Sequence, residues 1–212
     1  MTNVGAFTID PGVQLQMTVG GQTFNQNAGS LSGSGLVLSG VTFNDNGGPI
    51  NGTVRLRDSA LAIASALPAS FVVLGGCTMT GNISSGQSVT IVDGPGFNSV
   101  LTTGSFSNAG TIVMTSANGN QSALTLAGAS TLTNLSPGTV NVLPDNGGSR
   151  ALSGNILNSG AISITHPLAF TQSNTAIFPP SLVNTDGEYG NPNIPLSGGV
   201  SRVQMIYESY QL

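Results

Sequence analysis

Apolar and polar residues alternate in short runs along the first 165 residues of this chain. Five short triplets have an apolar residue at each end, and each triplet follows a turn rich in Gly, Ser or Thr. The triplets are Val54–Leu56, Val89–Ile91, Ile112–Met114, Val140–Val142 and Ile162–Ile164. Apolar residues at positions i and i+2 are typical of a half-buried β-strand. We therefore predict a short strand at each triplet.

A longer motif recurs between the triplets. It has an apolar strand, a Gly, a bulky apolar residue and an Asn close to a Gly, and its six copies span 17–29, 36–47, 72–82, 99–111, 124–134 and 151–160. A full unit is therefore three short strands, and the triplets start 35, 23, 28 and 22 residues apart. Such periods indicate a solenoid. Because parallel crossovers are nearly always right-handed, we predict an all-β, right-handed parallel β-helix of about six irregular coils.

Two positions of the motif have a clear physical role in such a fold. The bulky residues are expected to form one internal stack: Phe24, Phe43, Met79, Phe106, Leu132 and Ile156. The Asn residues suit turns, because Asn tolerates the left-handed region and bonds its own backbone. Stacked at the strand spacing of about 4.8 Å, their amides would form a hydrogen-bonded ladder. The expected ladder comprises Asn27, Asn46, Asn82, Asn108, Asn134 and Asn158.

The pattern divides the chain into a solenoid at 1–165 and two further segments. Within the solenoid, 58–70 is expected to be an insertion: a short helix over 60–67 that stops before Pro68, or a strand, since Leu61 and Ile63 alternate. Residues 166–199 hold five Pro and predict an extended arm. Residues 200–212 alternate at Val203 and Met205 and predict a strand. That strand would cap its own solenoid or add to a neighbouring subunit.

Composition narrows the possible partners. Charged residues are 6% of the chain, the net charge is −4, and the four basic residues are all Arg. Without a basic cluster, we expect neither nucleic acid nor a membrane surface as a partner. The sequence begins Met1-Thr2-Asn3 without a basic and then apolar segment, so we expect no signal peptide in this chain. Its one cysteine, Cys77, occupies a repeat position held elsewhere by Val41 and is predicted to be a small buried hydrophobe.

Polar residues that could carry chemistry are scattered along the sequence. The acidic residues are Asp10, Asp45, Asp58, Asp93, Asp145, Asp186, Glu188 and Glu208, and the only histidine is His166. Asp45, Asp93 and Asp145 each lie in a turn motif, where Asp is favoured for its own side-chain bond. Asp186 and Glu188 form the one close pair, in a loop flanked by Gly. We therefore nominate no catalytic, cofactor-binding or metal-binding residue, and we expect no enzyme and no cofactor.

Regular threonines on one solenoid face would indicate ice binding. Such a face requires a Thr array that recurs on equivalent strands. Thr102-Thr103 and the pair Thr131 and Thr133 do not recur in register in the sequence. We therefore do not expect such a face.

Two copies of the motif, Gly104–Ile112 and Gly154–Ile162, resemble the repeats of β-helical surface proteins such as filamentous haemagglutinins and autotransporter passenger stalks. The resemblance covers about residues 13–165 and implies the fold alone, because such solenoids host adhesins, virion proteins and lyases. No functional residue is carried over.

The expected function is that of a non-catalytic structural protein, a virion decoration or tail-associated β-helix at a particle surface. We expect a homo-oligomer, such as a trimer, or contact with neighbouring coat subunits through residues 166–212. One alternative is a fragment of a bacterial adhesin or surface-filament stalk, located outside the cell. The other is a module that binds or cleaves surface glycans.

Overall fold

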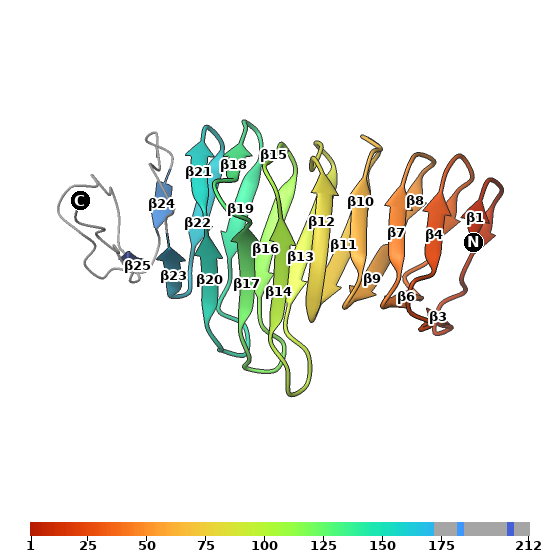
Figure 1. Ribbon diagram of the computed structural model, residues 1–212, viewed down its shortest axis with the longest axis horizontal. Coiled ribbons are helices and arrows are strands. Elements are labelled where there is room, and N and C mark those ends of the chain that lie inside the picture. The colour runs from red at the N-terminus through yellow and green to blue at the C-terminus, as the bar shows by residue number, and fades with distance from the viewer. Residues whose placement is uncertain (172–181, 185–202, 206–212) are drawn as a thin grey trace.

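The chain folds into a parallel β-solenoid (Figure 1). The computed structural model describes residues 1–171, 182–184 and 203–205. Every ladder between the strands of its four sheets is parallel, and the strands wind through about eight turns. The predicted all-β parallel solenoid is confirmed, with about eight coils instead of six, while its right-handedness stays a prediction.

Two long sheets form the walls of the solenoid (Figure 1). The ten-stranded sheet contains β1 (Thr2–Asn3), β4 (Thr23–Gln26), β7 (Thr42–Asp45), β10 (Ala60–Ile63), β12 (Gly76–Gly81), β14 (Ser99–Thr103), β17 (Ser122–Leu126), β20 (Arg150–Ser153), β23 (Leu168–Thr171) and β25 (Val203–Met205). The nine-stranded sheet contains β3 (Leu15–Met17), β6 (Leu36–Ser39), β9 (Thr53–Arg57), β11 (Ala69–Leu74), β13 (Gln87–Val92), β16 (Thr111–Thr115), β19 (Thr139–Val142), β22 (Ala161–Ile164) and β24 (Leu182–Asn184).

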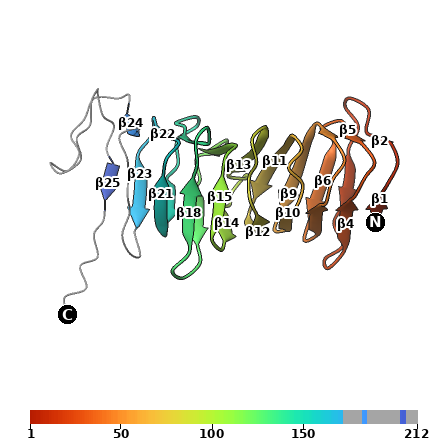
Figure 2. The ribbon, with the colours of Figure 1, turned by 90° about the horizontal axis from the view of Figure 1, so that it is seen from above.

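Two short sheets complete the coils at the two ends of the molecule (Figure 2). One contains β2 (Phe7–Thr8), β5 (Leu31–Ser32) and β8 (Ile50–Asn51). The other contains β15 (Phe106–Asn108), β18 (Thr131–Asn134) and β21 (Asn155–Asn158). Among the described residues there is no helix with the length and apolarity needed to cross a membrane.

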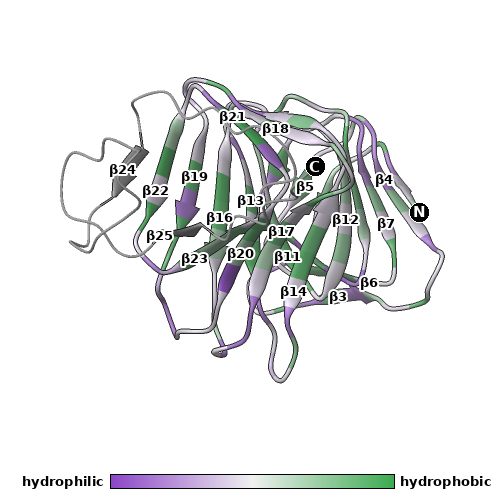
Figure 3. Cartoon of the chain, turned by 60° about the vertical axis from the view of Figure 1, so that its left-hand side comes forward, coloured by the Kyte–Doolittle hydropathy of each residue, from purple (hydrophilic) through white to green (hydrophobic). Residues whose placement is uncertain are grey.

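Strict alternation of side chains builds the core. Along β11, for example, Ala69, Phe71 and Val73 are buried while the residues between them are half-buried. Apolar segments therefore lie mostly in the strands and polar segments mostly in the turns (Figure 3). In register, each inward side chain packs on its equivalents one coil away, so the core is a set of columns along the solenoid.

The segment 58–70, predicted to be an insertion, is instead part of a regular coil; of the two structures predicted for it, the helix is wrong and the strand is confirmed. Strand β10 pairs with β7 and β12, and its Leu61 lies in register between Phe43 and Met79. Leu61 and Ile63 are buried, so the period-2 alternation decides the structure over the local helix propensity of the Ala residues. The spacing of 35 residues between the first two triplets therefore contains two coils, with Phe71 as the missed equivalent of Val54 and Val89.

The single predicted stack of bulky residues is divided between two sheets. Phe24, Phe43 and Met79 lie in one column of the ten-stranded sheet, and the rings of Phe24 and Phe43 stack with centroids 5.5 Å apart. The strand register places Thr103, not Phe106, opposite Met79. Phe106 begins a separate column with the other two predicted members, Leu132 and Ile156, in the sheet of β15, β18 and β21.

Longer coils explain this division. Side-chain hydrogen bonds between equivalent positions join residues 18 apart at Ser70 and Ser88, but 28 apart at Thr111 and Thr139. The additional residues of the later coils form the third sheet and longer loops. Beyond residue 165, β23, β24 and β25 still extend the two walls. The rest of the predicted arm and terminal segment lies outside the described residues.

Candidate functional site

Three long loops stack on one another along the lower edge of the solenoid (Figure 1). Residues 93–98, 116–121 and 143–149 each connect a strand of the nine-stranded sheet to the next strand of the ten-stranded sheet. We call these residues the loop ridge. The ridge and its flanking strands bring together Asp93, Asp145, Arg150 and His166, four of the polar residues that the sequence leaves scattered.

Asp93 connects the first two loops of the ridge. Its carboxylate accepts hydrogen bonds from the backbone N–H groups of Ala117 (2.5 Å), Asn118 (3.0 and 3.1 Å) and Asn120 (2.7 Å). Burial raises the pKa of Asp93, but the hydrogen bonds from these N–H groups and from the Ser116 hydroxyl outweigh burial, so the net shift is downward. The side chain therefore binds the turn of the next coil. The prediction that it bonds within its own turn is wrong.

Arg150 organises the third loop in a complementary way. Its side chain is fully buried, and its guanidinium donates to backbone carbonyl oxygens of the loop that precedes it. Nη1 donates to Gly147 (2.8 Å) and Gly148 (3.1 Å), and Nη2 donates to Leu143 and Pro144 (both 2.9 Å). A guanidinium presents several donors in a fixed plane, which suits a ring of carbonyl groups. Arg150 therefore closes the loop around itself.

The remaining polar groups of the ridge also bind the scaffold. The Thr115 hydroxyl donates to Asp145 Oδ2 (3.1 Å), and His166 Nε2 lies 2.7 Å from the carbonyl oxygen of Gly148. Burial lowers the pKa of Arg150, while the charges of Asp93 and Asp145 raise it. The two carboxylates thus act on one guanidinium, although nothing in their sequence positions predicts that they lie close together. Each group already has a structural partner.

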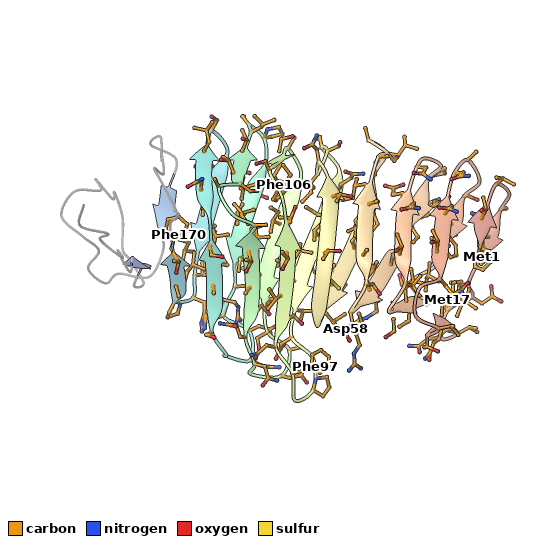
Figure 4. All side chains as sticks on the ribbon, viewed as in Figure 1. Met1, Met17, Asp58, Phe97, Phe106 and Phe170 are labelled. Atoms are coloured by element: carbon orange, nitrogen blue, oxygen red, sulfur yellow. The ribbon has the colours of Figure 1, made fainter. Side chains whose placement is uncertain are left out.

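An aromatic side chain flanks the ridge. The guanidinium carbon of Arg57 lies 4.4 Å from the centre of the Phe97 ring, and Arg57 Nε lies 3.3 Å from Asp58 Oδ2. Figure 4 shows Phe97 at the lower end of the ridge and Asp58 on a neighbouring turn. Gly94 leaves room for the Phe97 ring, because a Cβ at position 94 would collide with it. This cation–π contact is half-exposed and fixes the tip of the first loop.

The predicted asparagine ladder exists in two unequal parts and is not continuous. Asn108 Nδ2 donates to Asn134 Oδ1, and Asn134 Nδ2 donates to Asn158 Oδ1, both at 2.7 Å between fully buried side chains. Asn46 Nδ2 donates to Asn27 Oδ1 at 2.9 Å on the surface. Asn82 accepts from the backbone N–H of Ser107 instead.

Cys77 has the structural role that its sequence position predicts. It is 2% exposed, and its Sγ lies 3.2 Å from the carbonyl oxygen of Leu74. Burial raises the pKa of the thiol, so the thiolate is disfavoured. Val41 and Cys77 occupy equivalent positions, directly before Thr42 and Thr78 of the same column.

A column of hydroxyl groups lies on the outer face of the ten-stranded sheet, where the sequence predicted no recurring threonines. The register aligns Thr102 with Thr78 on one side and Thr125 on the other, so the prediction is wrong for Thr102. The column comprises Thr23, Thr42, Thr78, Thr102, Thr125, Ser153 and Thr171, and Ala60 interrupts it between Thr42 and Thr78. Small apolar residues flank its later part, among them Val100, Ala123, Ala151 and Ala169. The sequence hid this column because its spacing changes from coil to coil.

The other acidic residues do not join the ridge or are not described. Asp45 is buried at the opposite corner of the coil, and Asp10 is exposed in the first coil. Asp186, Glu188 and Glu208 lie outside the described residues. Among the residues that are described, no group of three or more His, Cys, Asp or Glu could hold a metal ion.

The fold and the site define a class of protein, a parallel β-solenoid whose buried polar groups bind its own turns. Comparison with protein families, with curated proteins and with solved structures finds no match for this chain.

Proposed function

We propose that this chain is a non-catalytic structural protein of a surface, a virion decoration or tail-associated β-helix that self-associates. The observation that supports it is how the buried polar side chains are used. Asp93, Arg150 and Asn134 direct their hydrogen bonds to neighbouring coils and loops, which stiffens a rod with an almost uncharged wall. A neutral wall of hydroxyl and methyl groups suits close packing beside other subunits.

The C-terminal end offers a place for a neighbouring subunit. β25 pairs with β23 of its own chain and is the last strand in the order of the ten-stranded sheet among the described residues. An edge strand presents unpaired N–H and C=O groups to which another chain can add. Capping the solenoid and binding a neighbour therefore use opposite edges of the same strand and can occur together.

Light scattering tests this proposal. The native mass is measured for the full chain and for a chain ending at Gly199, which lacks β25. We expect an oligomer for the full chain and a monomer for the shorter one. Two monomers would overturn self-association through this end and would favour the alternative of a stalk fragment, in which the coils act within one longer chain.

The hydroxyl column favours a second candidate function, binding to ice. Its threonines present a hydroxyl and a methyl group at the strand spacing of about 4.8 Å. Partition into slowly growing ice tests it, with Thr102→Tyr and Thr125→Tyr on the column and Thr90→Tyr on the nine-stranded sheet as the matched control. Ice binding predicts enrichment of the unchanged protein and of the control, and loss in the column variants. Equal exclusion of all of them would refute it.

A further inference from the structure

A second column of polar side chains lies inside the N-terminal coils. Asn3, Gln26 and Asp45 are in register on β1, β4 and β7, and they are 6%, 0% and 1% exposed. The column is built like the buried asparagine ladder at the other end of the molecule. Asn3 Nδ2 donates to Gln26 Oε1 (2.8 Å) and to the carbonyl oxygen of Ser30 in the following turn (3.0 Å).

The buried asparagine ladder shows which hydrogen bonds each member of such a column makes. Asn108 Nδ2 donates to Asn134 Oδ1 and to the carbonyl oxygen of Thr139, and Asn108 Oδ1 accepts from the N–H of Gly110. Each member thus accepts with its oxygen and donates with its nitrogen. A side-chain amide can do both, whereas an ionised carboxylate can only accept.

Asp45 is the third member of the N-terminal column and breaks this pattern. Neither of its carboxyl oxygens has a hydrogen-bond partner. The Nε2 of Gln26 donates to the carbonyl oxygen of Gly29, and the next residue in register is the apolar Ile63. The N–H of Gly47 faces the carboxyl without reaching hydrogen-bond geometry. The groups that β4, β10 and the turn after β7 place around the carboxyl therefore carry no charge and do not titrate.

The backbone of Asp45 couples this carboxyl to the next coil. Its carbonyl oxygen accepts from the N–H groups of both Ala64 and Ser65 at 2.9 Å. The turn after β10 is therefore held by Asp45, whose carboxyl group has no hydrogen-bond partner. An unpaired buried carboxylate is costly, but a neutral carboxylic acid has one O–H donor and a free acceptor, like an amide.

We propose that Asp45 is a proton-dependent stabilising residue of the N-terminal coils: its neutral acid replaces the amide that this column requires, and its ionisation weakens the contact by which its backbone holds the turn after β10. The protein is then more stable in mildly acidic than in neutral solution. This device acts on the scaffold itself and is independent of the proposed surface role.

The direction and range of the effect follow from burial. Burial raises the pKa of Asp45 from 3.8 to about 6, and the nearby Gly47 N–H lowers it only in part. Because the folded state favours the proton, the stabilisation that Asp45 contributes is complete below pH 3.8. This contribution is lost as the pH rises through about 6. Between pH 5 and pH 7.5, these two values raise the unfolding equilibrium constant about tenfold.

Urea unfolding of the full chain at several pH values tests the proposal. Asp45→Asn supplies a permanent amide, and Asp10→Asn removes one exposed negative charge as the matched control. We expect the unfolding constant of the unchanged protein and of Asp10→Asn to rise about tenfold, relative to that of Asp45→Asn, between pH 5 and pH 7.5. Equal pH dependence of all three proteins would overturn the proposal.

Two measurements on the unchanged protein do not depend on the folding of a variant. Carbon NMR of the Asp45 carboxyl should show titration near pH 6, and titration near pH 4 would refute the assignment. Hydrogen exchange should localise the effect. The amides of Ala64 and Ser65 should lose protection between pH 5 and pH 7.5, after correction for the intrinsic exchange rate, while that of Thr139 should not.

Discussion

Removal of the central amide of the buried ladder should strongly destabilise the C-terminal coils. Asn134 is fully buried, and Asn134→Ala removes three hydrogen bonds: one from Asn108 Nδ2, one to Asn158 Oδ1 and one to the carbonyl oxygen of Ala161 (3.1 Å). Each bond contributes about 1 kcal/mol net, and polar atoms left without a partner add a further penalty of about 1–3 kcal/mol. We therefore expect a loss of about 4–6 kcal/mol.

The surface part of the ladder provides a matched control. Asn27 is exposed and accepts one hydrogen bond from Asn46, so Asn27→Ala removes the same kind of amide contact where water replaces it. The expected loss is below about 1 kcal/mol. Urea unfolding followed by circular dichroism measures both losses. Because a repeat array can unfold in parts, hydrogen exchange at Ala161 and its neighbours should confirm that the loss is local.

A small effect at Asn134 would refute this reasoning. If Asn134→Ala loses less than about 1 kcal/mol, or no more than Asn27→Ala, the buried amides are not the source of corner stability. Contacts between the apolar columns would then be sufficient to hold the coils together. A loss in the expected range would make the ladder a main stabilising feature of the later coils.

Three further substitutions test the core and the loop ridge. Phe106→Ala should lower the free energy of unfolding by about 3–5 kcal/mol, because Phe106 is 5% exposed at the start of its own column. Phe97→Ala should lower it by about 1 kcal/mol. Urea unfolding compares the two variants. Asp93→Asn should cost about 2–4 kcal/mol at pH 7, because it replaces an acceptor of backbone N–H bonds. Since folding lowers the pKa of Asp93, the stabilisation by its carboxylate is present above pH 3.8 and is lost as the pH falls below that value. Asp93→Asn should therefore destabilise the protein less at pH 3 than at pH 7.

The solenoid was predictable because its local signals agree. The alternation of apolar residues gives the strands, and the Asn-x-Gly turns give the repeat. The coil of Leu61 and Phe71 was missed because Ala64 lies where the neighbouring coils have Asn46 and Asn82, so only the weaker period-2 signal remained. The Ala residues of the same segment favour a helix by their local propensity. The pairing of β10 with β7 and β12 stabilises a strand there instead.

Equivalence between copies could not be read from the motif alone. The copies at 36–47 and 99–111 look alike, yet Leu36 begins a strand of the nine-stranded sheet and Ser99 begins a strand of the ten-stranded sheet. The motif describes a strand, a bend and a strand, which occur at more than one corner of the coil. The pairing of Met79 with Thr103, and that of Phe106 with Leu132, show that Phe106 belongs to another sheet.

Asp45 and Asp93 show why the surroundings of the buried polar residues could not be predicted from the sequence. Both precede turns with Gly, and both are 1% exposed, yet burial raises the pKa of Asp45 while backbone N–H groups lower that of Asp93. The difference arises in the neighbouring coil. Residues 24 to 27 positions away aim their N–H groups at Asp93, whereas Gln26 and Ile63 offer Asp45 no donor. In a solenoid, the chemistry of a turn residue is therefore set by the next coil, whose distance in sequence varies and whose register only the fold defines.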